Sequence, residues 1–314
     1  MTAFIYDPIY KKHFAGAGHP ESPQRLEAVM DLIEKTNFAG HLEIVKPRQA
    51  TDEEILTVHT ERYLQQVRND IDSGRRMLSM GDTDVCGVSL DAAVKAAGGI
   101  CLAVDHVVSG KHRNAFCAVR PPGHHSGAER GSGFCVFNNV AIAARHAQKK
   151  HDISRVLIVD WDVHHGNGTQ ETFYADPSVL FFSTHQWPLY PGTGRPDETG
   201  SGQGAGTTIN CPFRFGAGRD EIVGAFRDKL IPAADRFKPE LVLISAGFDS
   251  RTEDPLGGFE LTDDDFVELT KIMLGIAQKH ASSRLVSTLE GGYYPEGLAK
   301  AVAAHCRTLA SWQA

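Results

Sequence analysis

Residues 156–165 read VLIVDWDVHH, an apolar run that ends in alternating acidic and imidazole side chains. Every second residue of an extended strand lies on the same face, so Asp160, Asp162 and His164 can point to one side. Burying two carboxylates together is costly unless a cation or a protonated partner lies between them. The segment therefore predicts a buried strand that ends at a metal-binding or hydrogen-bonding site.

Three further apolar segments also end in polar residues. They are AFCAV (115–119) before His124 and His125, LVLISAGF (241–248) before Asp249, and RLVSTLEGG (284–292) before Tyr293. Short apolar runs of this kind are typical of buried parallel strands. In open α/β sheets, ligands bind beyond the carboxyl ends of the strands. The four segments together predict one site that is assembled from distant parts of the chain.

Helical patterns alternate with strand-like runs along the whole sequence. Helices are expected at about 22–36, 52–70, 89–109, 138–150, 219–237, 263–280 and 296–312. Strands are expected near 3–6, 115–119, 155–161, 179–183, 207–210, 241–247 and 284–289. This alternation favours an α/β fold with a mostly parallel sheet and helices on both faces. No change in composition marks a linker, so residues 1–314 are expected to form a single domain.

The composition is that of an ordinary globular protein, with 41% hydrophobic and 23% charged residues. The net charge of −7 and the lack of a long basic run disfavour nucleic-acid binding as a main activity. Six scattered cysteines without a Cys-x-x-Cys pair predict mostly buried, reduced thiols. The N-terminus does not resemble a signal peptide, and no apolar segment is long enough to cross a membrane. A cytoplasmic protein without membrane contact is expected.

The residue types at the strand ends suggest a metal centre. Asp162, His164 and Asp249 supply two oxygen ligands and one nitrogen ligand. Catalytic zinc typically has three protein ligands and leaves one position for water. Iron, cobalt and manganese also accept oxygen-rich ligand sets, so the ligand types alone do not decide the metal.

Other polar residues near these ends could transfer protons and stabilise negative charge. Histidine is suited to proton transfer near neutral pH, and a tyrosine hydroxyl can donate to a developing oxyanion. Asp160 can orient His124, and Asn167 can orient His125; an acidic partner raises basicity more than a neutral amide does. We therefore expect His125 to be the general base, His124 to act mainly through its charge, and Tyr293 to bind the oxyanion. These parts fit a metal-assisted hydrolase of an amide or ester.

Several longer motifs resemble the signature blocks of the zinc-dependent histone deacetylase family. They are RPPGHH, GFCVFNN, VDWDVHHGNGTQ, SAGFDSRTEDPLGG and LEGGYY, which lie between about residues 115 and 295, and HPESPQR (19–25). The resemblance implies the arginase/deacetylase fold, with a central eight-stranded parallel sheet. It also implies one zinc ion per chain and a structural potassium ion.

The resemblance implies a role for each residue that matches a motif. The zinc ligands would be Asp162, His164 and Asp249, and the potassium site would consist of Asp160, Asp162, His164 and Ser183. The catalytic residues would be His124, His125 and Tyr293, with Asp160 and Asn167 as partners of the histidines. The substrate-binding residues would be Gly133, Phe134, Tyr190 and Asp82, with Asp84 as a second candidate at the rim of the site.

Asn167 replaces the aspartate of class I enzymes, so the chain resembles class II deacetylases. The expected activity is removal of acetyl groups from N-acetyl-lysine in proteins or peptides, with release of acetate. Acetylpolyamine amidohydrolases share much of the core, so a small acetylated amine is an alternative substrate. Two further alternatives are arginase-like chemistry with two manganese ions and an acyl-lysine binding module without turnover. The sequence leaves open zinc versus iron, and whether the chain forms a homo-oligomer.

Overall fold

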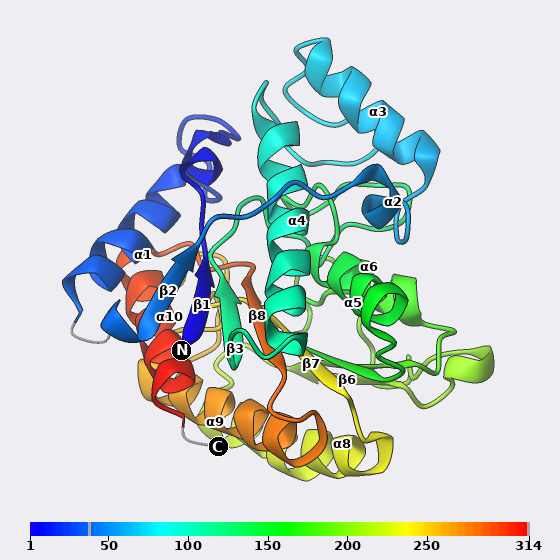
Figure 1. Ribbon diagram of the computed structural model, residues 1–314, viewed down its shortest axis with the longest axis vertical. Coiled ribbons are helices and arrows are strands. Elements are labelled where there is room, and N and C mark those ends of the chain that lie inside the picture. The colour runs from blue at the N-terminus through cyan, green and yellow to red at the C-terminus, as the bar shows by residue number, and fades with distance from the viewer. Residues whose placement is uncertain (37–38, 313–314) are drawn as a thin grey trace.

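Eight parallel strands form one central sheet in the computed structural model, which describes residues 1–36 and 39–312 (Figure 1). The strands are β1 (Thr2–Ile5), β2 (Leu42–Val45), β3 (Asn114–Cys117), β4 (Val156–Asp160), β5 (Val179–Gln186), β6 (Thr208–Phe213), β7 (Leu241–Ala246) and β8 (Leu285–Leu289). Their order across the sheet is β2-β1-β3-β8-β7-β4-β5-β6. The expected α/β fold is thus confirmed, and all the pairings are parallel rather than most of them.

Helices cover both faces of this sheet (Figure 1). They are α1 (Pro23–Lys35), α2 (Asp52–Ile55), α3 (Glu61–Asp72), α4 (Ser89–Val108), α5 (Asn139–His151), α6 (Asn167–Phe173), α7 (Arg219–Ala225), α8 (Ile231–Phe237), α9 (Asp263–His280) and α10 (Pro295–Ser311). Helices α4 and α5 pack together on one face, and α1, α10 and α9 pack side by side on the other. The described residues contain no helix with the length and apolar character that a membrane crossing needs.

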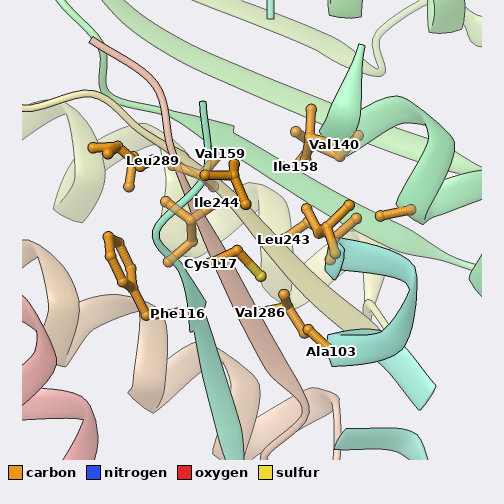
Figure 2. Packing of buried hydrophobic residues seen from close by; sticks show 14 of the residues in the cluster. Ala103, Phe116, Cys117, Val140, Ile158, Val159, Leu243, Ile244, Val286 and Leu289 are labelled. Carbon is orange, nitrogen blue, oxygen red and sulfur yellow. The ribbon is translucent and has the colours of Figure 1, made fainter. Parts of the chain in front are cut away.

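The sheet register explains why the central strands are apolar over most of their length. Ile158, Leu243 and Val286 are paired neighbours on β4, β7 and β8, and they face Ala103 of α4 and Val140 of α5 (Figure 2). All five side chains are fully buried. The alternate strand residues are buried against the helices of the opposite face, so neither face needs polar side chains.

The structure differs from the sequence predictions mainly at four places. The seven-residue helix α6 was not predicted, because its NGTQETF sequence contains a glycine and only one apolar residue. The edge strand β2 was not predicted, because its LEIV sequence is short, partly exposed and interrupted by a charged residue. The helix expected over 52–70 is two helices, since the chain leaves the helical conformation between α2 and α3. The helix expected over 219–237 contains a π-helical turn at Phe226–Leu230, just before Pro232, which has no N–H to continue the regular ladder.

The cysteines follow the prediction with one exception. All six are free thiols, and five of them are buried. Cys86 is only partly buried, because it lies in the loop that precedes α4 rather than in an apolar element.

A glycine in α4 allows a close approach between this helix and the segment that joins β2 to α2. A methyl group at Gly98 would lie 2.3 Å from the backbone nitrogen of Ala50 and 2.3 Å from the carbonyl oxygen of Arg48. Gly98→Ala is therefore expected to lower the free energy of unfolding, by about 1–3 kcal/mol for an overpacked core. Denaturant unfolding measures this loss.

Gly275→Ala is the matched control, because Gly275 is also helical, in α9, and its added methyl group meets nothing within 4 Å. Alanine favours a helix over glycine by about 1 kcal/mol, so this variant should be as stable as the wild type or more stable. Equal stability of the two variants would contradict the close approach at Gly98.

Candidate active site

Three predicted metal ligands converge beyond the carboxyl ends of β4 and β7. The Nδ1 atom of His164 lies 3.0 Å from Oδ1 of Asp162 and 3.1 Å from Oδ2 of Asp249. All three side chains are buried. Strand β4 ends at Asp160, so the bend that follows it, rather than an extended strand, brings Asp162 and His164 to Asp249. The residues of the VDWDVH alternation thus lie close to Asp249, although the extended geometry predicted for them was wrong beyond Asp160.

Backbone N–H groups hold the two carboxylates in place. Val163 donates to Oδ1 of Asp249 (2.8 Å), and Gly291 donates to Oδ2 of Asp162 (2.8 Å). A Cβ atom at Gly291 would lie 2.1 Å from Oδ2 of Asp249, so the close approach of the β8 loop requires glycine. The carboxylates are therefore oriented by the fold before any ion binds.

The chemistry of this donor set fits a divalent metal. Two buried carboxylates and one imidazole offer ligand atoms that all lie within 4.8 Å of one another. Such a group of acids is unfavourable in the interior unless a cation balances it. Two oxygen ligands, one nitrogen ligand and one side open to a cavity are the arrangement of catalytic zinc centres.

The tandem histidines lie next to this group and have different partners. The Nδ1 atom of His124 is 2.9 Å from Oδ2 of Asp160, and the Nδ1 atom of His125 is 2.8 Å from Oδ1 of Asn167. The two ring centroids are 4.0 Å apart. Each partner accepts a hydrogen bond from the N–H group at Nδ1, so Nε2 is the nitrogen that is left for chemistry.

The unequal partners give the two histidines opposite pKa shifts. Burial alone would lower the pKa of His124, but the charges of Asp160 and Asp162 outweigh it and raise this pKa well above the ordinary value. Burial, together with the charges of His124 and His164, lowers the pKa of His125 well below the ordinary value. The structure therefore favours a charged His124 beside a neutral His125.

Glu290 supports this pair and was missed by the sequence reasoning. Its Oε2 accepts hydrogen bonds from the backbone of Gly123 (2.6 Å) and of His124 (3.2 Å), and its Oε1 accepts one from Ser245 (3.1 Å). Burial raises the pKa of Glu290 to about 7. The signal was the acidic residue within LEGGYY, which is unusual directly after a buried strand.

A buried ion network joins the N-terminal loop to the loop that carries Tyr293. Arg25 donates from Nε to the carbonyl of Gly292 (2.6 Å) and from Nη2 to the carbonyl of Glu290 (2.5 Å). Glu21 pairs with Arg25 (3.0 Å) and also with Arg120. These three charged side chains are fully buried. The sequence marked HPESPQR as a motif but gave no role to Glu21 or Arg25.

A cavity of about 320 Å³ opens above the metal ligands. Its lining contains His125, Gly133, Phe134, His164, Tyr190, Tyr293 and Asp82, all of which were predicted as site residues, together with Leu189 and Leu256. The two leucines carry no sequence signal, because an apolar loop residue looks the same whether it lines a cavity or packs in a core. All four predicted substrate-binding residues and two of the predicted catalytic residues, His125 and Tyr293, thus line one cavity, whereas His124, Asp160 and Asn167 are not in its lining.

Aromatic rings form the walls of this cavity. The ring of Tyr190 is 5.1 Å from that of His125, and the ring of Phe134 is 5.8 Å from that of Tyr293. Gly133 has a φ of 54°, and a Cβ atom there would lie 2.2 Å from the imidazole of His125. Glycine at this position leaves room for the histidine against the wall.

The remaining candidates lie at the rim and behind the site. Asp82 is exposed and accepts a hydrogen bond from the backbone of Gly133 (3.0 Å). Asp84 does not line the cavity but lies 3.6 Å from His19. Ser183 is paired with Asp160 across β5 and β4, and its hydroxyl group lies 2.9 Å from His185.

Comparisons with known proteins identify the family of this chain. The histone deacetylase domain model matches residues 19–309. A "Probable deacetylase" of Archaeoglobus fulgidus is 39% identical over 95% of this chain and 82% of its own length. "Polyamine deacetylase HDAC10" of Homo sapiens is 41% identical over 92% of this chain, which corresponds to 44% of the human protein.

The crystal structure of the HDA15 HD domain superposes with a TM-score of 0.93 at 36% identity, covering 98% of this chain and 89% of that one. The family match and the structural match each cover nearly the whole sequence. The chain belongs to the histone deacetylase domain family.

Proposed function

We propose that this protein is a zinc-dependent amidohydrolase that removes acetyl groups from N-acetyl-lysine side chains and releases acetate. The proposal depends mainly on one observation: a buried Asp–His–Asp group lies beside two histidines of opposite pKa shift, at the base of an aromatic cavity. Relatives that are named deacetylases support the reaction class. A binding module without turnover would not need this set of proton-transfer groups.

The residues divide the reaction between them. Asp162, His164 and Asp249 would hold zinc, which when bound lowers the pKa of water and polarises the acyl carbonyl. His125 is the neutral imidazole beside the ligands, so it accepts the proton of the attacking water. His124, held in its charged form by Asp160, stabilises negative charge in this buried site.

Tyr293, which lines the cavity, would bind the oxyanion that forms from the acyl carbonyl. Burial raises the pKa of its hydroxyl well above the ordinary value, so the group stays protonated and can donate a hydrogen bond. Its backbone N–H is fixed by Asp254 (2.6 Å), and its ring lies 5.0 Å from the guanidinium of Arg25. The Arg25 network thereby acts as a positioning device for the tyrosine.

The N-acetyl-lysine substrate fits the shape and lining of the cavity. A lysine side chain is a narrow apolar stem, and its acetylated end has no charge. The rings of Phe134 and Tyr190 and the side chains of Leu189 and Leu256 provide an apolar passage to the histidines. Such a passage favours an uncharged amide over a free ammonium group, which would lose its hydration there.

A small acetylated amine is the second candidate, and one residue favours it. Asp82 carries a carboxylate at the exposed rim of the cavity, where it could bind the distal ammonium group of an acetylpolyamine. The 41% identical human relative is named a polyamine deacetylase. For a peptide substrate, the same carboxylate would instead accept hydrogen bonds from the peptide backbone.

Several finer expectations stay predictions. They are a structural potassium ion near Asp160 and Ser183, a single domain over residues 1–314, a cytoplasmic location and a homo-oligomer. Metal analysis of the purified protein decides between zinc and iron, and two manganese ions per chain would instead indicate arginase-like chemistry.

Tyr293→Phe is expected to lower kcat on an acetyl-lysine peptide by about 10²–10³-fold, the usual loss for one oxyanion donor. Its zinc content should equal that of the wild type, since the tyrosine hydroxyl is not a metal ligand. Acetate release and metal analysis on the same samples measure both quantities. Tyr294→Phe is the matched control and should keep wild-type turnover. Wild-type turnover in Tyr293→Phe would remove this residue from the mechanism.

Asn167→Asp is expected to move the acidic limb of the pH profile of kcat/KM to higher pH. A carboxylate at this position would place negative charge against Nδ1 of His125 and raise the pKa of the imidazole. The base must be neutral to accept a proton, so a higher pKa requires a higher pH for activity.

Glu171→Gln is the control for this experiment, because it changes a charge on the same helix at an exposed pair with Arg130. Its acidic limb should stay where it is in the wild type. An unchanged limb in Asn167→Asp would argue against His125 as the general base.

Asp82→Asn distinguishes the two substrate classes. The amide keeps an oxygen that accepts hydrogen bonds but removes the negative charge. If the substrate is a peptide, kcat/KM should change only slightly. For a cationic acetylpolyamine, kcat/KM should fall in the variant and should no longer depend on the salt concentration. Turnover of an acetyl-lysine peptide and of acetylputrescine, each at low and high ionic strength, measures the difference. Faster wild-type turnover of acetylputrescine would overturn the peptide assignment while leaving the amidohydrolase proposal intact.

A further inference from the structure

A second group of metal-binding side chains lies between α4 and α5, outside the active site. The Nε2 atoms of His146 and His151 lie 2.8 Å and 2.7 Å from the same oxygen, Oδ1 of Asp105. Three possible ligand atoms of these residues are within 4.8 Å of one another. From this convergence we propose that Asp105, His146 and His151 form a second binding site for a divalent transition metal, with zinc as the expected ion.

The orientation of His146 is the first argument for this site. Its Nδ1 lies 2.9 Å from Oε1 of Glu54, while its Nε2 faces Asp105. Each ring nitrogen therefore faces a carboxylate oxygen, and an imidazole with one proton can donate to only one of them. A cation at Nε2 resolves the contact between the nitrogen lone pair and the carboxylate.

Glu54 has the position that a carboxylate takes behind a metal-bound histidine. A histidine ligand usually donates its other ring N–H to a carboxylate, which fixes the ring and increases its basicity. Glu54 is itself fixed by two hydrogen bonds from Arg48 (2.5 and 2.7 Å) and one from the backbone of Thr51 (2.9 Å). This carboxylate is therefore engaged from the other side and serves to orient His146 rather than to bind the ion.

The site is open enough to exchange an ion with solvent. His146 is buried, whereas the side chains of Asp105 and His151 are 18% and 19% exposed. Two nitrogen ligands and one oxygen ligand leave a coordination position for water, as zinc sites with three protein ligands do. Imidazole-rich sets bind zinc, nickel and copper more tightly than manganese or iron.

One neighbouring charge opposes the metal. Lys150 lies 2.9 Å from Oδ2 of Asp105, so its ammonium group shares the carboxylate with the two imidazoles. Its side chain is 54% exposed and can move into solvent. A bound zinc ion would contact Oδ1 of Asp105, and Lys150 would either stay at Oδ2 or move into solvent. Lys150→Gln should therefore bind zinc more tightly than the wild type.

The metal would join elements at the edge of the sheet opposite to the active site. Asp105 belongs to α4, and both histidines belong to α5, which is 13 residues long. Helix α5 begins beside the loop of the tandem histidines, and His146 and His151 follow its first residue by 7 and 12 positions, or about 10 and 18 Å along the helix axis, so the second site is separate from the active site. Its expected role is to clamp α4 to α5, and changes there should leave basal deacylation unchanged.

Equilibrium dialysis of the full chain at micromolar free Zn²⁺, followed by metal analysis, tests the proposal. The wild type should hold one zinc ion per chain more than His151→Ala and one more than Asp105→Asn. Because the zinc count is compared between variants, zinc bound in the active site contributes equally to each of them and does not affect the result. Added Zn²⁺ should also raise the Tm of the wild type more than that of His151→Ala.

His280→Ala is the matched control, because His280 lies 2.7 Å from Asp235, a carboxylate that Lys279 also contacts but that no second described imidazole contacts. It should keep the wild-type zinc count. Cys101→Ala tests the other side of the ring, where Cys101, Glu54 and His146 also come within reach of one another. A zinc count that falls in Cys101→Ala but not in His151→Ala would overturn the proposal. An equal zinc count in the wild type, His151→Ala and Asp105→Asn would also overturn it, and the three side chains would then form only a hydrogen-bonded network.

Discussion

Two buried carboxylates held against each other are the constraint on which the structure of the active site depends. Asp162 and Asp249 come from the ends of different strands, and both lie within about 3 Å of His164. Isolated charges of this kind are expensive to bury, so the fold supplies fixed backbone donors to both carboxylates. A parallel sheet suits this purpose, because the carboxyl ends of all its strands meet at one edge.

A second buried charge network determines where the tyrosine loop lies. Glu21, Arg25 and Arg120 are fully buried, and Arg25 binds two carbonyl groups of the loop before Tyr293. Removing one member of a buried ion group commonly costs about 3–5 kcal/mol, because the others stay uncompensated. The N-terminal loop is therefore part of the active-site support, although it lies more than 250 residues from the tyrosine in sequence.

The central residues of the site could be predicted from sequence because their pattern is local and chemical. An apolar run followed by Asp, His or Tyr indicates both a buried strand and its functional end, as in VLIVDWDVH. The partly exposed edge strand β2 lacks such a run, and the break between α2 and α3 ends at Thr60, whose side chain caps α3 by accepting a hydrogen bond from the backbone of Tyr63. Glu290 and Arg25 were missed because their partners are backbone atoms of distant loops, and Leu256 was missed because apolar lining has no chemical mark.

The cluster of Asp105, His146 and His151 could not be predicted from the sequence either. The sequence places Asp105, His146 and His151 on two helices, where isolated histidines are usually surface or packing residues. Their convergence depends on the crossing of α4 and α5 and on Glu54, which fixes the imidazole from a third helix. At the strand ends the order of the residues reveals the ligand set, whereas between helices only the packing brings the ligands together. Helix-borne sites of this kind are therefore visible in structures and hidden in single sequences.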